Sequence, residues 1–304
     1  MQFAPSFRRR FIGDKAFYKM VFAIALPIIV QNTVSNFVNL LDNIMIGAIG
    51  TEPMSGVSIA NQILMIFFAG VFGCNAGAGI FSAQFAGAQD HEGVRHTLRF
   101  KLYGALIICT LGILIYSLFG RTLIGLYLTE DASGDTAATL EYGWAYLKII
   151  LISLVPMAIS QVYASTLCET GETALPMKAT IAEVFTNAIL NYLLIFGKLG
   201  LPAMGVVGAA LATLISRLVG LAILLLYTHT HGKKHPFIVG AYSSPRIPKA
   251  LTKDILRKGM LLLVNEELWA LGMTILMQQY SMRGLMVVAA SNICGTISNM
   301  FAMF

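Results

Sequence analysis

The chain has 304 residues, of which 57% are hydrophobic and only 12% are charged, and its formal net charge is +6. Soluble domains carry about 25% charged residues, so this composition excludes an ordinary soluble domain and predicts a membrane protein with several spans. The basic residues stand between apolar runs, as orientation signals do, and form no basic face or recognition motif. We therefore expect no nucleic acid among the partners.

Apolar runs of membrane-spanning length recur along the chain. Crossing the hydrocarbon core takes about 20 residues of helix, and the sequence holds seven full runs and part of an eighth. In chain order the runs are Phe17 to Ile46, Val57 to Ala86, Leu98 to Phe119, Ala138 to Leu167, Pro176 to Phe196, Gly205 to Tyr227, Ile255 to Tyr280, and a last one that begins near Met286. We expect an all-α integral membrane fold.

A polar segment at 229–254 separates the first six runs from the rest. It contains Pro236, Pro245 and Pro248, which disfavour a helix. We therefore predict three parts: residues 1–228 form a six-helix transmembrane lobe, residues 229–254 a cytoplasmic linker, and residues 255–304 the first part of a second transmembrane lobe. Transporters are commonly built from such repeated helical units.

The distribution of Lys and Arg predicts the orientation. Basic residues concentrate in the N-terminal tail MQFAPSFRRR, in the loop region of Arg95, Arg99 and Lys101, and in the 229–254 linker. Cytoplasmic loops carry such an excess, so we expect a multi-pass protein of the cell (inner) membrane with a cytoplasmic N-terminus. No small-residue cleavage site follows the tail, which indicates a retained helix and no signal peptide.

The first run carries a polar stripe. Asn32, Ser35, Asn39 and Asp42 follow one another in steps of three or four, so they share one face of a helix. A carboxylate within an apolar span is expensive and usually functional. The alternative is that Asp42, which lies late in its run, reaches the membrane interface.

Two further runs carry polar residues at helical spacing. Glu183, Asn187 and Asn191 lie in steps of four on the fifth run, where they either line a site or form interhelical hydrogen bonds. Thr213 and Arg217 share a face of the sixth run. Arg217 is either a counter-charge to a buried acid or a side chain that reaches the interface.

The seventh run contains Asn265, Glu266 and Glu267 with Trp269 nearby. Adjacent glutamates point about 100° apart on a helix, so we expect one of the two to face the bundle. Trp269 offers an aromatic surface to a cation, or it packs in the core.

No enzyme motif is present, neither a nucleophile elbow nor a phosphate-binding glycine loop nor a zinc-binding HExxH. The four cysteines lie far apart without metal-ligand spacing. We expect a protein that is not an enzyme, has no cofactor, and binds no metal beyond a possible Na⁺ at Asp42.

Three segments resemble the multidrug and toxic compound extrusion (MATE) transporters. They are ALPIIVQNTVSNFVNLLDNIMIG, TLCETGETALPMKATIAEVFTNAILNYLLIFGKLGLPAMGVVGAALATLIS and NEELWALG, and the second is the most specific. The resemblance covers essentially the whole chain. It implies a fold of twelve helices in two six-helix lobes around a central cavity, with drug efflux coupled to Na⁺ or H⁺ entry.

The resemblance also assigns roles to individual residues. Pro27 matches a helix-bending proline and Asp42 a functional aspartate of the first helix. Asn187, Thr213 and Glu266 match family positions on the fifth, sixth and seventh helices.

One departure concerns the fifth helix, where some members carry an aspartate at the position of Asn191. We therefore predict a cation-coupling site of Asp42, Asn187, Asn191 and Thr213, in which Asp42 is the only acid.

The predicted substrate cavity contains polar and aromatic residues from both lobes. Its candidates are Gln31, Ser35, Asn39, Glu266 and Trp269.

The expected function is a secondary active antiporter that exports drugs or amphipathic organic cations in exchange for H⁺ or Na⁺. The expected partners are membrane lipid, the organic cations and the second lobe, because the chain ends inside its eighth run. Three alternatives remain: a lipid-linked oligosaccharide or polysaccharide flippase of the same superfamily, a channel, and a non-transporting fragment. No ring of like residues or filter loop favours the channel.

Overall fold

The computed structural model describes residues 14–128 and 135–301, in which every regular element is an α-helix. The helices are α2 (Lys15–Gly47), α3 (Thr51–Gly87), α4 (His91–Gly125), α5 (Thr136–Glu169), α6 (Ala174–Phe196), α7 (Gly205–Thr230), α8 (Lys249–Ser281) and α9 (Leu285–Phe301). Seven of them, α2 to α8, are long and apolar enough to cross a membrane. The predicted all-α membrane fold and its helix order are confirmed, whereas the basic tail at 1–13 lies outside the described residues.

Short polar residues fix where several helices begin, and a glycine fixes where α6 ends. Asp14 precedes α2 and accepts a hydrogen bond from the backbone nitrogen of Phe17 at 2.7 Å. Asp90 and Asp135 cap α4 and α5 in the same way. Such caps satisfy backbone N–H groups that have no partner within the helix. Gly197 ends α6 with φ of 64°, a left-handed conformation that glycine adopts without strain.

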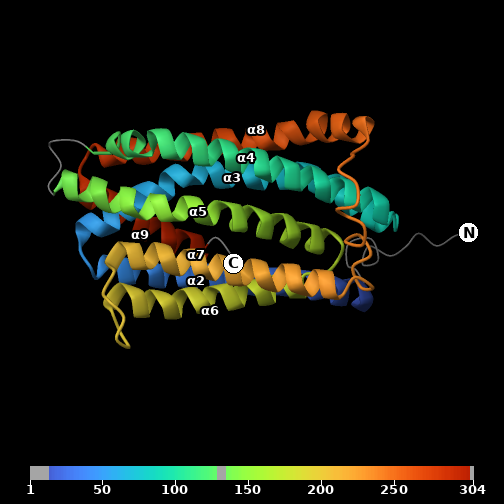
Figure 1. The fold of residues 1–304 in the computed structure, drawn as a ribbon, viewed down its shortest axis with the longest axis horizontal. Helices are drawn as coiled ribbons and strands as arrows, with labels where there is room; N and C mark the ends of the chain where they lie inside the picture. The colour runs from blue at the N-terminus through green and yellow to red at the C-terminus, as the bar shows by residue number, and fades with distance from the viewer. Residues whose placement is uncertain (1–13, 129–134, 302–304) are drawn as a thin grey trace, which may run out of the picture.

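Helix α3 is the central element of the bundle. It packs against α4, α5 and α8, while α6 packs against α7 and α2. Figure 1 shows α8, α4 and α3 along one side of the molecule, α5 in the middle, and α7, α2 and α6 along the other side. The short α9 lies against α3 and α2. The core therefore forms around α3 and α5, and two groups of helices flank it.

Two glycine contacts let α3 approach its neighbours closely. A Cβ atom on Gly77 would lie 2.6 Å from the Cα atom of Gly259, so α3 and α8 touch through their backbones. A Cβ atom on Gly56 would lie 2.8 Å from the backbone nitrogen of Gly143 on α5. Small residues at helix crossings are typical of membrane bundles, because close backbone approach replaces hydrophobic driving force.

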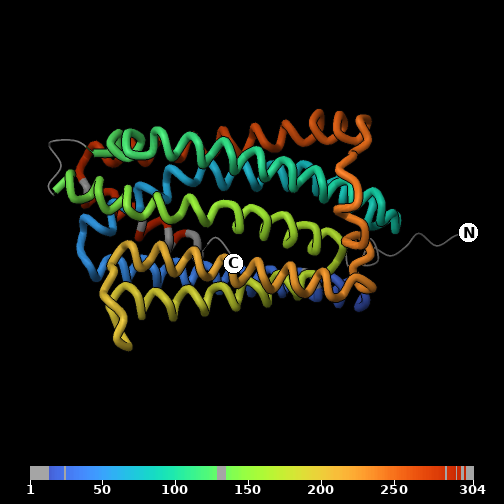
Figure 2. Tube along the Cα trace, viewed as in Figure 1, coloured from blue at the N-terminus to red at the C-terminus, as the bar shows by residue number. Residues whose placement is uncertain are grey.

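The linker between α7 and α8 spans 231–248 and is shorter than the predicted segment. Helix α7 continues to Thr230, and α8 begins at Lys249, directly after Pro248, although the sequence placed the start at Ile255. A proline disfavours the interior of a helix but is compatible with its beginning. Figure 2 shows the linker, in orange, at the same end of the bundle as the start of α2.

The linker is bound to α4 mainly through Arg99. The Arg99 guanidinium donates hydrogen bonds to the backbone carbonyls of Ala241, Gly240 and Arg246, at 2.6, 3.0 and 3.2 Å. The Tyr103 hydroxyl, one turn further along α4, donates to another linker carbonyl at 3.2 Å. The linker therefore docks on the first six helices through these backbone groups and also through the buried side chains of Phe237 and Ile238, which belong to the main apolar core.

Candidate functional site

The four predicted cation-coupling residues lie together, although they come from three helices. The amide nitrogen of Asn191 donates to Asp42 Oδ1 at 2.6 Å and to Asn187 Oδ1 at 3.1 Å. The amide nitrogen of Asn187 donates to Thr213 Oγ1 at 3.3 Å. The cluster thus joins α2, α6 and α7 through polar side chains. Their role in coupling remains a prediction.

The spacing of the residues explains the cluster. Asn187 and Asn191 are one turn apart on α6 and therefore stack along one face. Helix α6 packs between α2 and α7, so this face meets Asp42 on one side and Thr213 on the other. Thr213 also donates to the backbone carbonyl of Ala209, one turn earlier, which fixes its hydroxyl at 3.0 Å from that oxygen.

The Asn187 amide has two orientations that fit its surroundings. In one, its oxygen accepts from Asn191 and its nitrogen donates to Thr213. In the other, its nitrogen lies 3.0 and 3.1 Å from the two carboxylate oxygens of Asp42. Oxygen and nitrogen of an amide are interchangeable in shape, and the hydrogen-bond network decides between them. The carbonyl oxygen of Asn191 is buried and has no partner among the described residues.

Two polar cavities meet at Asp42. The larger has a volume of about 340 Å³ and is rich in amide side chains, and the smaller has a volume of about 180 Å³. Both are lined by Asn39, Asp42, Thr213 and Arg217. Of the predicted substrate-cavity residues, Asn39 lines both cavities, Ser35 lines the smaller one, and Gln31 lines neither.

Arg217 supplies a positive charge to both cavities. Its Nη1 atom donates to Ser153 Oγ at 3.0 Å, and its guanidinium carbon lies 5.6 Å from the centre of the Phe68 ring. Glu183 lines the smaller cavity, and its charge attracts that of Arg217. Of the two interpretations of Arg217 left open by the sequence, the structure favours the counter-charge, because the side chain points into the bundle.

The remaining predicted residues lie elsewhere. Glu266 and Trp269 are on α8, which packs on α3 and not on the helices of the Asp42 cluster. Trp269 is 58% exposed, so it is not packed in the core of the described bundle. Helix α2 continues through Pro27 without interruption. The substrate role of Glu266 and Trp269 and the bending role of Pro27 therefore remain predictions.

Sequence reasoning missed a buried ion pair between α4 and α5. Lys101 Nζ lies 2.5 Å from Glu169 Oε2 and 3.3 Å from Ser165 Oγ, and the Lys101 side chain is fully buried. The interpretation of Lys101 as a basic loop residue was wrong, because α4 begins at His91 and carries Lys101 into the bundle. No local pattern reveals the pair, since Glu169 is 68 residues away.

Comparisons with known proteins agree on one group of transporters. The family model described as MatE matches residues 27–193, more than half of the chain. The chain is 30% identical over 242 residues to "Probable multidrug resistance protein NorM" of Thermotoga maritima, which covers 79% of this chain and 50% of that protein. The chain spans about half the length of the curated relatives that it matches.

Solved structures share the fold. One is described as the MATE multidrug transporter DinF-BH, with a TM-score of 0.78 at 23% identity, over 95% of this chain and 62% of that one. Another is an inward-facing conformation of a multidrug resistance MATE family transporter, with a TM-score of 0.73 at 22% identity, over 93% of this chain and 64% of that one. At these identities the likeness concerns the arrangement of helices alone.

Proposed function

The chain belongs to the MatE family, and from this membership we propose that it carries the ion-coupling lobe of a multi-pass antiporter. This antiporter exports drugs or amphipathic organic cations in exchange for H⁺ or Na⁺. The observation that carries the proposal is the Asp42 cluster, in which one carboxylate meets neutral amide and hydroxyl groups at the junction of two polar cavities. An ionisable residue within a membrane bundle marks an ion pathway more often than a structural role.

Coupling follows from the change in charge at Asp42. When Asp42 is ionised, the amide nitrogens of Asn191 and, in its second orientation, Asn187 both face the carboxylate. A proton or Na⁺ on Asp42 favours the opposite amide orientation, in which oxygens face the site. Because Asp42 is on α2 and both asparagines are on α6, each state prefers a different packing of these helices. An ion with different affinities for two packings shifts the population between them.

The oxygen set of the cluster suits Na⁺ as well as H⁺. Hard cations prefer oxygen ligands. The cluster offers the carboxylate of Asp42, the hydroxyl of Thr213 and the side-chain carbonyl of Asn191, which has no partner among the described residues. The two asparagines therefore have a different role with each coupling ion. They coordinate Na⁺ directly, whereas with H⁺ they only orient the protonated carboxyl group of Asp42.

The test uses proteoliposomes loaded with a fluorescent organic cation and imposes a Na⁺ or a pH gradient. We expect one gradient to drive transport and Asp42→Asn to abolish it, with helix content unchanged. Asp254→Asn is the matched control, because this exposed carboxylate lies at the start of α8. Gradient-driven transport by Asp42→Asn at the parent rate would refute the coupling role.

A second lobe is the proposed partner, because the matched part of this chain covers only about half of the length of its curated relatives. We propose that the two lobes together enclose the transport path. Transport by the 304-residue chain alone would contradict this requirement. No transport even after a second lobe is supplied would favour the non-transporting fragment.

The proposed membrane is the cell (inner) membrane, with the N-terminus and the linker in the cytoplasm. The start of α2 and the linker lie at one end of the bundle (Figure 1), and the linker and the sequence that precedes α2 are both basic. A membrane-impermeant thiol reagent added outside intact cells should label Lys198→Cys, at the other end of α6, and spare Ser243→Cys in the linker. The reverse pattern would overturn the orientation.

Arg217 favours a second candidate function, the flipping of a lipid-linked oligosaccharide. A guanidinium in a polar cavity suits a phosphate or pyrophosphate group, and Arg217 lines both cavities. This function predicts transport of the anionic lipid, loss of transport in Arg217→Gln and partial activity in Arg217→Lys. Transport of organic cations that persists in Arg217→Gln favours the antiporter instead.

A further inference from the structure

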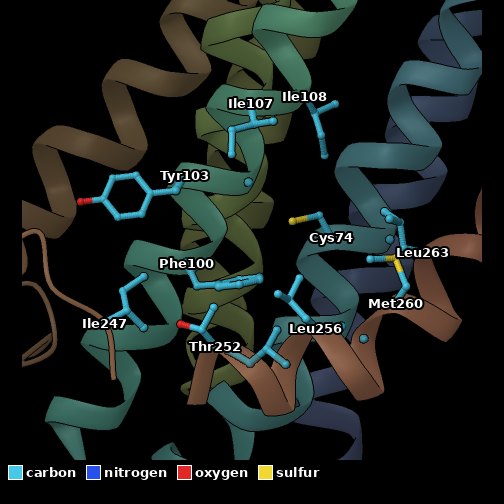
Figure 3. A pocket seen from close by; sticks show the side chains of 15 residues that line it. Cys74, Phe100, Tyr103, Ile107, Ile108, Ile247, Thr252, Leu256, Met260 and Leu263 are labelled. Atoms are coloured by element: carbon cyan, nitrogen blue, oxygen red, sulfur yellow. The ribbon is translucent and has the colours of Figure 1, made fainter. Parts of the chain in front are cut away.

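An apolar cavity lies apart from the Asp42 site, between α3, α4 and the beginning of α8. Its volume is about 450 Å³. Figure 3 shows Phe100, Thr252 and Leu256 at one end of it, Ile107 and Ile108 at the other, and Cys74 between them. Glycines on all three helices also line it, namely Gly73, Gly77, Gly104 and Gly259.

The cavity offers almost no hydrogen bonds to a ligand. The Tyr103 hydroxyl is used by the linker carbonyl of Pro245, and Thr252 donates to the backbone carbonyl of Pro248. Cys74 is the remaining side chain with a polar atom, and a thiol is only a weak donor. The remaining lining side chains are aliphatic, aromatic or thioether groups. A ligand therefore has to present an apolar portion here.

The cavity opens toward the lipid-facing surface of the bundle. Ile107 on α4 is 60% exposed, and Leu256 and Met260 on α8 are each 46% exposed, although all three line the cavity. No helix in the part of the chain that the structure describes covers these side chains, so an acyl chain of the bilayer can reach them. Helix α3 separates this opening from the helices of the Asp42 cluster.

Basic residues continue the lining face of α8 toward the linker. Lys249 and Lys253 precede Leu256 by two turns and one turn, and steps of three or four residues place all three on one stripe. Arg257 lies one turn after Lys253. All three basic side chains are exposed, and none forms an ion pair within the part of the chain that the structure describes.

We propose that this cavity binds one acyl chain of an anionic phospholipid, whose headgroup contacts Lys249, Lys253 and Arg257. The apolar lining accepts the chain, and the basic stripe accepts the phosphate at the membrane surface. Juxtamembrane Lys and Arg residues attract anionic lipids in this way. A cationic amphiphile would fit the lining but would meet three positive charges. The lipid would bridge α4 of the first lobe to α8.

The experiment measures lipid contact directly and does not depend on transport. In a Trp144→Phe, Trp269→Phe background, Phe100→Trp places a fluorophore in the cavity, and Leu114→Trp places one on the lipid-facing side of α4 outside it. Phospholipids brominated on their acyl chains quench a nearby tryptophan. We expect brominated phosphatidylglycerol to quench the reporter at position 100 at a mole fraction at least threefold lower than brominated phosphatidylcholine. The reporter at position 114 should not distinguish them.

The charge requirement is tested with Lys249→Gln, Lys253→Gln and Arg257→Gln combined. This variant should lose the preference for phosphatidylglycerol at position 100, whereas Lys198→Gln at the other end of the bundle should keep it. Equal quenching by both lipids at position 100 would overturn the proposal, and so would displacement of the anionic lipid by an organic cation. If a reporter variant fails to fold, native mass spectrometry of the unmodified chain decides: phosphatidylglycerol adducts should outlast phosphatidylcholine adducts.

Discussion

The amide nitrogen of Asn191 donates to Asp42 Oδ1 at 2.6 Å, across the contact between α6 and α2. A neutral donor therefore stands beside the carboxylate where a second acid would place another negative charge. This pairing keeps the site at a single negative charge when Asp42 is ionised. The first prediction follows from adding the second acid.

Replacing Asn191 by aspartate should strengthen Na⁺ binding, because it adds an anionic oxygen next to Asp42. A tenfold gain in affinity corresponds to about 1.4 kcal/mol of additional stabilisation at saturating ligand. The measurement is the shift in thermal unfolding between NaCl and choline chloride at equal ionic strength. Asn191→Leu is the control and should show a smaller shift than the parent. Identical shifts in parent and Asn191→Asp would contradict the placement of a cation at Asp42.

Replacing Lys101 by methionine should destabilise the bundle more than replacing both partners of its ion pair. The single change leaves Glu169, whose side chain is only 17% exposed, without its cation. Removing one partner of a buried pair costs about 3–5 kcal/mol, whereas apolar replacement of both is often near neutral. Unfolding midpoints in detergent should therefore fall for Lys101→Met and recover by at least half in Lys101→Met with Glu169→Leu. An additive double variant would show that the pair is not coupled.

Replacing Arg99 by alanine should release the linker. Arg99 donates three hydrogen bonds to linker carbonyls, whereas Arg95 donates one, to the carbonyl of Pro236 at 3.1 Å. Amide hydrogen exchange across 231–248 should accelerate at least tenfold in Arg99→Ala and less in Arg95→Ala. Exchange in α6, which the linker does not contact through these bonds, serves as the internal control. An unchanged linker in Arg99→Ala would mean that other contacts hold it.

Acidification should loosen the linker through His235. Burial and the nearby charges of Lys234 and His231 lower the pKa of His235 below its usual value of 6.5, and Glu172 opposes this effect. His235 therefore binds a proton more readily when the linker is released than when it is docked. Docking is complete above about pH 6.5 and weakens as the pH falls through that value. Linker hydrogen exchange, corrected for its intrinsic pH dependence, should rise on acidification in the parent and stay flat in His235→Gln. His91→Gln, a change at an exposed residue of α4, should behave as the parent.

Local patterns were sufficient for the helices, whereas the grouping of residues around Asp42 came from the family resemblance. The period of the apolar runs predicts α2 to α9, because a membrane helix must satisfy its backbone within itself. The polar stripe of α2 and the four-residue steps of α6 each place polar side chains on one face of a helix, a feature encoded within one or two turns of sequence. The family resemblance was needed to group Asp42 with Asn187, Asn191 and Thr213.

Local sequence patterns did not predict the contacts between distant segments. The partner of Lys101 is Glu169, and the partners of Arg99 are linker carbonyls more than 140 residues away. A basic residue near the beginning of an apolar run looks the same in sequence whether it faces water, lipid headgroups or a buried acid. The position of Trp269 likewise depends on how α8 crosses α3, which residue spacing does not determine.

The direct backbone contact between Gly77 and Gly259 has a mechanical consequence. Elsewhere, tilting one packed helix against another requires ridges of side chains to leave their grooves. Gly73 and Gly77 bring the α3 backbone close to Leu263 and Gly259 of α8, so no side chain of these two α3 residues interlocks with α8. A bulkier residue at Gly259 would push the two helices apart along this stretch.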